Sequence, residues 1–495
     1  MKQLGVLDTA FINLEQTNTP QHIGGMGIYD PSTAPGGFVR FKQVIANFEQ
    51  RLHRLPLFRT RLHQVPGNLD RPYWVVDENF DVEFHLRHIA LPHPGDWRQL
   101  CIQIARLHSR PLDMSRPLWE AYIIEGLDNI SDLPEGSFAV YTKMHHALVD
   151  GAGGQSFMAA LHDLEPEPEE NSDAMLNQAP IVIDHKPNSG ELLARALVNQ
   201  TRNTVSLASG SVSLARDFAK LGYGIFKKTV PLPDINAPKT RFNTPVGKHR
   251  AFEAATFALE DFKAIKNAFG VKINDVALAV VSGAMRRYLE QLGELPDVSL
   301  AAGIPMNMRT RRGVNEDNNQ VGSVFCKLHT DIADPVERLR AIQQSATDAK
   351  EFGEKSPLVD AMKLVGVFSP WFAKGGAKLY SSGKISRHMP VNISTVVTNV
   401  PGANFDLYCA GARLVRYHGL GVLTPGVGLF HAIFSFGDSV TISILADREQ
   451  LEDPMQYREH VEASFEELKS LAAKASQPKT KASGKSRKRK ASSGQ

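Results

Sequence analysis

Cysteine and long apolar runs are both scarce in this chain. The three cysteines, Cys101, Cys326 and Cys409, are scattered without metal-ligand or redox spacing, which argues against a disulfide or zinc framework and fits a reducing compartment. The longest apolar stretch, residues 276–285, falls well short of the ~18 residues that a membrane-spanning helix needs. The N-terminus lacks the apolar core and cleavage site of a secretory signal. These absences predict a cytoplasmic protein.

Acidic residues are missing from the last part of the chain, residues 474–495, which contains eight lysines and arginines. The whole chain has a net charge of +3, so the remainder has a charge of −5. A folded part with an acidic balance is not expected to bind nucleic acid, because such domains usually present a basic face. We expect the tail itself to be a disordered basic arm, since its Ser, Gly and Ala residues cannot form a core.

The length of 495 residues, 42% of them hydrophobic, is typical of a soluble protein with more than one core. Proline-rich breaks near residues 165–173 and 231–245 divide the chain. We predict an N-terminal lobe at residues 1–165, a linker with amphipathic helices at 166–245, a C-terminal lobe at 246–473 and the tail at 474–495. Both lobes mix strands and helices without a strict βαβ order, so the predicted fold class is α/β with mixed sheets.

Apolar periodicity predicts the individual elements. In the first lobe we expect a helix around residues 41–52 and another at 97–107, with strands at 72–76, 80–85, 119–125 and 136–146, followed by a helix at 153–164. In the second lobe we expect helices at 259–269, 274–292, 336–352 and 454–473, with strands at 251–257, 298–305, 324–328, 391–399, 415–419, 429–436 and 440–446. Gly437 and Asp438 predict a hairpin turn between the last two strands.

The motif HHxxxDG, from His145 to Gly151, stands at the end of a predicted strand. Alternation along that strand places His146 on the apolar face with Met144, and His145 on the opposite face with Lys143. A histidine in such a place can accept a proton at neutral pH. The alternative is a pair of structural histidines, whereas metal binding is disfavoured because no further ligand motif accompanies them.

Three other segments become informative when they are considered together with this motif. Arg116 opens the sequence RPLW before a strand, Asn274 and Asp275 open a helix, and Asn399 begins the sequence NVPG at a strand end. Taken singly, these read as a turn with a buried Trp119, an N-cap and a turn.

Together, the ordered motifs PLW, HHxxxDG, ND and NVPG resemble the bacterial wax ester synthase/diacylglycerol acyltransferase family over residues 4–471. HHxxxDG alone is shared with a broader superfamily of CoA-dependent acyltransferases and condensation domains. The resemblance implies two chloramphenicol-acetyltransferase-like lobes with an active site in a channel at their interface. It also implies transfer of a fatty acyl group from acyl-CoA, the co-substrate, to a long-chain alcohol or to diacylglycerol, with no metal and no bound cofactor.

Within that scheme we expect His146 to be the general base and His145 to support the strand geometry. Asn274 is the candidate oxyanion donor. Asp150 and Gly151 are expected to shape the turn, with Asp150 meeting Arg309 of the other lobe as the resemblance suggests, and Asp275 is expected to be structural.

Two alternative functions share some of these features: a condensation-type amide-forming enzyme and a non-catalytic lipid-surface protein. Lipid substrates, the amphipathic stretch at residues 358–380 and the basic tail lead us to expect peripheral contact with the inner membrane or with lipid inclusions.

Overall fold

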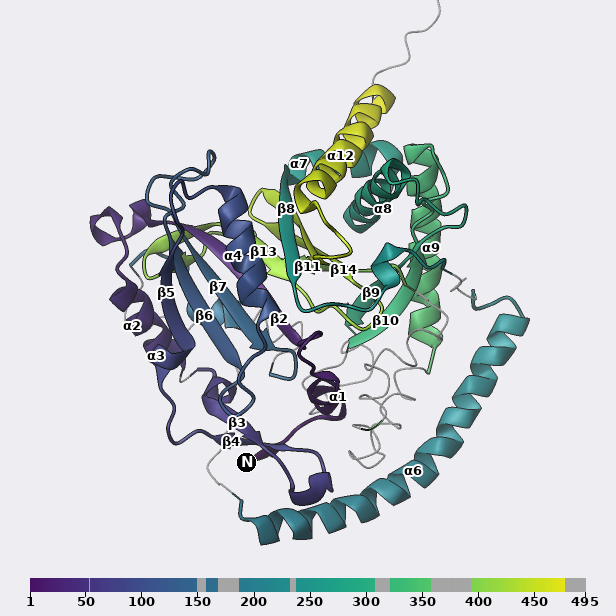
Figure 1. Cartoon of the computed structure of the whole chain (residues 1–495). Helices are drawn as coiled ribbons and strands as arrows, with labels where there is room; N and C mark the ends of the chain where they lie inside the picture. Colours follow the sequence, from purple (N-terminus) through teal and green to yellow (C-terminus); the bar gives the residue numbers. More distant parts are fainter. Residues whose placement is uncertain are drawn as a thin grey trace, which may run out of the picture.

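The computed structural model describes residues 1–52, 54–148, 157–167, 187–231, 237–307, 321–357, 375 and 393–476. Within these ranges the chain forms two lobes that lie side by side, each built on a six-stranded sheet (Figure 1). Both sheets mix parallel and antiparallel pairs, as the sequence predicts.

The first sheet has the strand order β12-β13-β2-β7-β6-β5. Its strands are β12 (Tyr408–Cys409), β13 (Ala412–Leu420), β2 (His22–Asp30), β7 (Phe138–His145), β6 (Trp119–Glu125) and β5 (Leu86–Ala90). Helices α1 (Val6–Leu14), α2 (Phe41–Leu52), α3 (Val82–His85) and α4 (Trp97–Ser109) accompany it. A small sheet of β1 (Lys2–Gln3), β4 (Tyr73–Val76) and β3 (Thr60–His63) lies beside them.

The second sheet has the order β10-β9-β11-β14-β15-β8. Its strands are β10 (Val321–Lys327), β9 (Ala301–Asn307), β11 (Thr395–Pro401), β14 (Leu429–Phe436), β15 (Ser439–Asp447) and β8 (Arg250–Ala258). Helices α7 (Leu259–Phe269), α8 (Ile273–Gln291), α9 (Pro335–Lys355) and α12 (Pro454–Ser476) pack together on this lobe. The predicted hairpin is confirmed, because Gly437, with φ of 55°, turns the chain between β14 and β15.

Strands from the C-terminal half of the chain complete the first sheet. Strand β13 comes from the C-terminal half of the sequence but pairs antiparallel with β2 of the first sheet. A shared apolar cluster contains Tyr141 and Leu100 from the first lobe together with Phe252 and Phe430 from the second. The lobes are therefore joined both by hydrogen bonds and by a common core, which the sequence did not predict.

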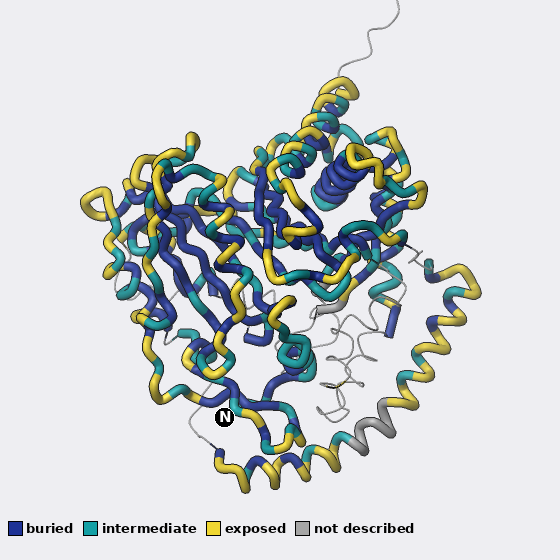
Figure 2. The backbone as a smooth tube through the Cα atoms, viewed as in Figure 1, coloured by how far each residue is buried: buried dark blue, intermediate teal, exposed yellow. Residues whose placement is uncertain are grey.

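One element prediction differs from the structure. The expected strand at 80–85 is wrong: Asp81 accepts a hydrogen bond from the Glu83 amide and caps the single-turn helix α3, and the strand β5 begins only at Leu86. The linker was expected to contain amphipathic helices, and its described part contains one long helix. Helix α6 (Ser189–Phe226) runs uninterrupted for 38 residues along the outside of both lobes (Figure 1) and has a largely exposed surface (Figure 2).

Candidate active site

The histidine pair stands at the end of β7, the strand flanked by β2 and β6 in the first sheet. As predicted, alternate residues of β7 face different cores: Val140 and Met144 pack in the first-lobe core, and Ala139 and Tyr141 in the core between the lobes. The main chain holds the pair in place, because the His145 amide donates to the Leu118 carbonyl and the His146 amide to the Gln21 carbonyl.

His146 lies on the apolar side of the strand. Its ring stacks on Phe11 of α1, with 4.0 Å between centroids and 10° between the planes. The residue is half-buried, and its Nδ1 atom is fully buried. Burial lowers the pKa of His146 to about 4, and the neighbouring His145 adds to this effect. The imidazole is therefore neutral at pH 7.

His145 lies on the other face and has a polar setting. Its Nδ1 accepts a hydrogen bond from the Ala147 amide at 3.0 Å, so the neutral ring carries its proton on Nε2. That Nε2 faces Glu15 Oε2 at 3.4 Å, and the same carboxylate accepts from the Gln21 amide. His145 thus ties the turn after β7 to the segment that follows α1.

Behind His145 lies a buried polar network. His22, the cross-strand partner of His145, contacts the His108 carbonyl of α4 through its Nε2 at 2.8 Å. His108 in turn contacts the Tyr141 hydroxyl at 2.7 Å, and burial lowers the pKa of His108 to about 3. Sequence reasoning missed His22 and Glu15, because each is a single polar residue without a motif of its own.

Lys143, two residues before His145, is fully buried. Its ammonium group donates to the carbonyls of Leu107 and Arg110 at 3.2 and 2.9 Å and lies 3.3 Å from Glu120 Oε2. Burial lowers the pKa of Lys143, and Glu120 opposes that shift. The strand end that carries the histidines is therefore fixed to the C-terminal end of α4.

The PLW segment has the structural role expected of it. Trp119 is buried at the start of β6 and donates from Nε1 to the Phe58 carbonyl at 2.8 Å. Its neighbour Leu118 supplies the carbonyl that accepts from the His145 amide. The turn and buried tryptophan that the sequence predicts thus also support the histidine pair.

The ND and NVPG segments meet in the second lobe. Asn399 of β11 donates from Nδ2 to Asn274 Oδ1 at 3.2 Å. Asn274 and Asp275 are not the N-cap, since α8 has Lys272 in that position; instead the buried Asp275 carboxylate accepts from the Lys272 amide at 2.8 Å. Within the described ranges, no side-chain hydrogen bond joins Asn274 to His146. Asp150, Gly151 and Arg309 lie outside the described residues.

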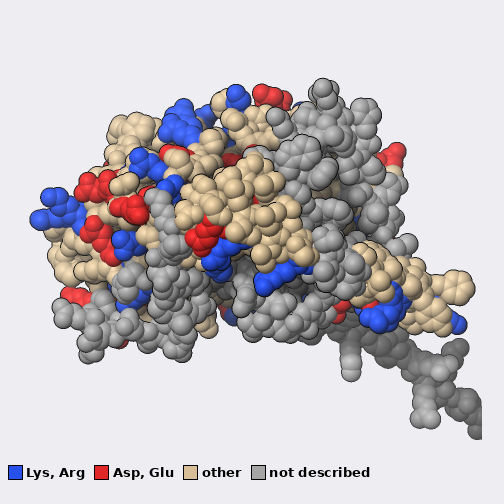
Figure 3. All heavy atoms as spheres, turned by 90° about the horizontal axis from the view of Figure 1, so that it is seen from below, with Lys and Arg blue, Asp and Glu red and all other residues tan. Residues whose placement is uncertain are grey.

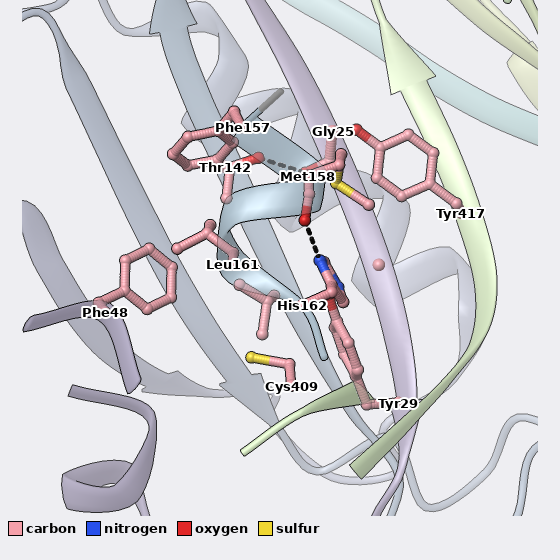
Figure 4. A pocket seen from close by; sticks show the side chains of 12 residues that line it. Gly25, Tyr29, Phe48, Thr142, Phe157, Met158, Leu161, His162, Cys409 and Tyr417 are labelled. Carbon is pink, nitrogen blue, oxygen red and sulfur yellow. Dashed lines mark hydrogen bonds between the residues drawn. The ribbon is translucent and has the colours of Figure 1, made fainter. Parts of the chain in front are cut away.

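A small hollow lies between the core side of β7 and the helical segment at residues 157–161 (Figure 4). Tyr29 and His162 close it with a hydrogen bond of 2.8 Å between the hydroxyl and Nε2. Its volume of about 10 Å³ has room for one water and not for an acyl chain. This hollow therefore belongs to the packing of the lobe.

Residues 4–277 match the family described as the wax ester synthase/diacylglycerol acyltransferase catalytic domain, and residues 318–469 match the WS/DGAT C-terminal domain. A Mycobacterium bovis protein named as a diacylglycerol O-acyltransferase is 31% identical over 464 residues, which cover 93% of this chain and 97% of that protein.

Among solved structures, the wax ester synthase/diacylglycerol acyltransferase from Marinobacter aquaeolei VT8 has a TM-score of 0.67 at 25% identity and covers 96% of this chain and 100% of that one. The first condensation domain of the calcium-dependent antibiotic synthetase has a TM-score of 0.56 at 12% identity, covering 96% and 97%, and shares the fold.

The two lobes with their mixed sheets define an acyltransferase of the chloramphenicol-acetyltransferase-like class. The chain belongs to the wax ester synthase/diacylglycerol acyltransferase family. Both the predicted fold class and the predicted family are confirmed.

Proposed function

We propose that this acyltransferase moves a fatty acyl group from acyl-CoA to the hydroxyl of diacylglycerol or of a long-chain alcohol, with His146 as general base. The observation that carries the proposal is the place of His146: it follows β7 directly, stacks on Phe11 and has a pKa of about 4. A base that is neutral at pH 7 is ready to accept a proton without first losing one.

In the proposed reaction, Nε2 of His146 takes the hydroxyl proton, because Nδ1 is buried. The hydroxyl oxygen attacks the thioester carbonyl and forms a tetrahedral oxyanion. When the C–S bond breaks, the CoA sulfur leaves as a thiolate and receives the proton back from His146. No nucleophilic serine or cysteine is required, because the thioester is already activated and binding aligns the two reactants.

Other residues take supporting roles in this scheme. His145 would fix the turn through Ala147 and Glu15. Asn274, whose Oδ1 is held by Asn399, is the proposed donor to the oxyanion through its Nδ2. A contact between Asp150 and Arg309 stays a proposal.

Product analysis tests the reaction. The purified protein is given radiolabelled palmitoyl-CoA together with hexadecanol, diacylglycerol or a primary amine, and the lipids are separated. We expect labelled wax ester or triacylglycerol. A labelled amide would instead assign the chain to condensation-type chemistry, and no labelled product would favour the non-catalytic lipid-surface protein.

We further propose that the protein works in the cytoplasm, attached peripherally to the inner membrane or to lipid inclusions. The stretch 358–380, apart from Gly375, and the tail from residue 477 lie outside the described residues, but α6 offers an independent argument. Leu197, Val212 and Phe226 are 67%, 74% and 81% exposed along this helix, which also carries Arg202 and Arg216. An apolar helix surface with cations suits the boundary of an anionic lipid layer.

On the face that Figure 3 shows, Lys and Arg side chains lie among uncharged side chains, and Asp and Glu side chains also occur there. Among the described residues, no single helix is long and apolar enough to cross a membrane, although α7 and α8 together pass that test with a bend of 98° between them. Flotation with anionic vesicles tests the contact. Val212→Glu plus Phe226→Glu should reduce flotation, whereas Leu292→Glu plus Val298→Glu, exposed apolar residues outside α6, should not.

A further inference from the structure

A cleft lies where α4 faces the start of β8. The cleft there has a volume of about 750 Å³, within the range of small-molecule sites. One wall is a stripe of α4, and the other consists of residues 248–253 and 448–455 of the second lobe. The cleft thus lies between the two lobes.

Cations dominate this cleft. Five of them, all exposed, make no ion pair or side-chain hydrogen bond within the described part of the chain: Arg98, Arg106, Arg110, Lys248 and Arg448. Arg98 and Arg106 lie eight residues apart on α4, and Arg110 is the C-cap of that helix. A sixth cation, Arg250, is held by the main-chain carbonyls of Gly247 and Asn18.

The carboxylates that line the cleft are engaged elsewhere. Glu253 is buried, accepts from Trp97 Nε1 at 2.9 Å and has a raised pKa because of its burial. Asp453 accepts from the Gln456 amide at the start of α12, and Glu452 lies 3.8 Å from Arg241. Six cations against three carboxylates leave the lining with a net positive charge, which favours an anionic ligand bearing several phosphates.

The cleft adjoins elements that hold the histidine pair in place. Arg110, at the end of α4, supplies the carbonyl that holds Lys143 of β7, three residues before His146. Thr17, another lining residue, belongs to the same short connection as Gln21, whose carbonyl accepts from the His146 amide. A ligand in the cleft would therefore lie beside elements that position the strand end carrying the histidines.

We propose that this cleft binds the phosphates of the nucleotide part of acyl-CoA. The inference rests on the proposed function, because it assigns the acyl donor's own recognition site. Arginine suits this role, since its guanidinium group contacts phosphate oxygens in pairs. The other reading is that Arg106 and Arg110 only stabilise the C-terminal end of α4.

Two donors separate these readings: palmitoyl-CoA, and S-palmitoyl-N-acetylcysteamine, which has the thioester but no phosphate. Arg106→Ala plus Arg448→Ala removes one cation from each wall. We expect the KM for palmitoyl-CoA to rise roughly tenfold per side chain, with kcat little changed, while kcat/KM for the phosphate-free donor changes less than twofold. Arg340→Ala plus Lys350→Ala removes the same charge from α9 and should leave the KM for palmitoyl-CoA unchanged.

Calorimetric titration with CoA alone provides a direct readout, with wild-type affinity falling as salt rises and the cleft variant binding at least tenfold more weakly. An unchanged KM, or an equal change with both donors, would overturn the proposal. So would loss of binding to phosphatidylglycerol vesicles with CoA binding intact, since that result would assign the cations to lipid headgroups. If neither donor yields ester even with the wild type, the proposed function itself fails.

Discussion

We predict that the buried ion pair of Lys143 and Glu120 contributes to the stability of the protein, so that removing one partner lowers the unfolding free energy. Glu120→Gln keeps the size of the side chain but leaves the Lys143 ammonium, which is fully buried, without its counter-charge. Removing one partner of a buried ion pair costs about 3–5 kcal/mol. The Glu120 side chain is 12% exposed and Lys143 keeps two carbonyl partners, so we expect the low end, about 3 kcal/mol.

Lys143→Met should cost less, about 1–3 kcal/mol. Glu120 then still accepts from the Tyr122 hydroxyl at 2.8 Å and pairs with Arg87 at 3.1 Å, so its charge stays compensated. In the double variant neither charge is left alone, and its loss of unfolding free energy should fall short of the sum of the single losses by at least about 1 kcal/mol.

Urea unfolding followed by tryptophan fluorescence measures these free energies, and equal m-values show that the variants unfold from comparable states. Losses that add within about 0.5 kcal/mol would refute the coupling. A loss below about 1 kcal/mol for Glu120→Gln would refute the view that Lys143 is buried as a cation.

Two further predictions concern packing and pH. A Cβ at Gly25 of β2 would lie 1.9 Å from the Tyr417 hydroxyl, so Gly25→Ala should lower the unfolding free energy by about 1–3 kcal/mol. Gly222 lies on the open surface of α6, so Gly222→Ala should raise the unfolding free energy by up to about 1 kcal/mol in the same urea assay. Burial lowers the pKa of several histidines to about 3 or 4, so the unfolded chain takes up protons that the folded chain does not as the pH falls below about 6.5. The histidines concerned are His108, His146, His162, His418 and His431. The unfolding free energy, measured as a function of pH, should therefore drop by several kcal/mol between pH 6.5 and pH 4. A flat profile would contradict the burial of these histidines.

Apolar periodicity and turn residues predicted those helices and strands whose formation depends mainly on residues close in the sequence. The strands at 429–436 and 440–446 and the helices at 259–269 and 274–292 have strong periodicity and clear turn residues, and the structure contains β14, β15, α7 and α8 at nearly the same bounds. The family followed from motifs in a fixed order, and the fold class followed from the mixture of predicted strands and helices.

Long-range pairing was not predictable from one sequence. Strand β2 contains Gly24, Gly25 and Gly27, which disfavour a strand locally, yet these glycines make room for the rings of Tyr141 and Tyr417 and the side chain of Leu414. The entry of β13 into the first sheet depends on partners almost 400 residues away in the sequence. The same holds for the candidate site. The HHxxxDG motif is visible in the sequence, but its neighbours Phe11, Glu15 and His22 are identified only from the positions of α1 and β2 in the structure.

The most direct test of the proposed chemistry is the steady-state turnover of His146→Ala beside His145→Ala, with palmitoyl-CoA and the preferred alcohol. A positioned general base contributes about 10²- to 10⁴-fold. We expect His146→Ala to lose that much kcat with an unchanged melting temperature, and His145→Ala to lose less. In the wild type, kcat/KM should hold as the pH falls through 6.5 and decline only toward pH 4, because protonation of His146 removes the base. A correctly folded His146→Ala protein with near-wild-type turnover would contradict the assignment.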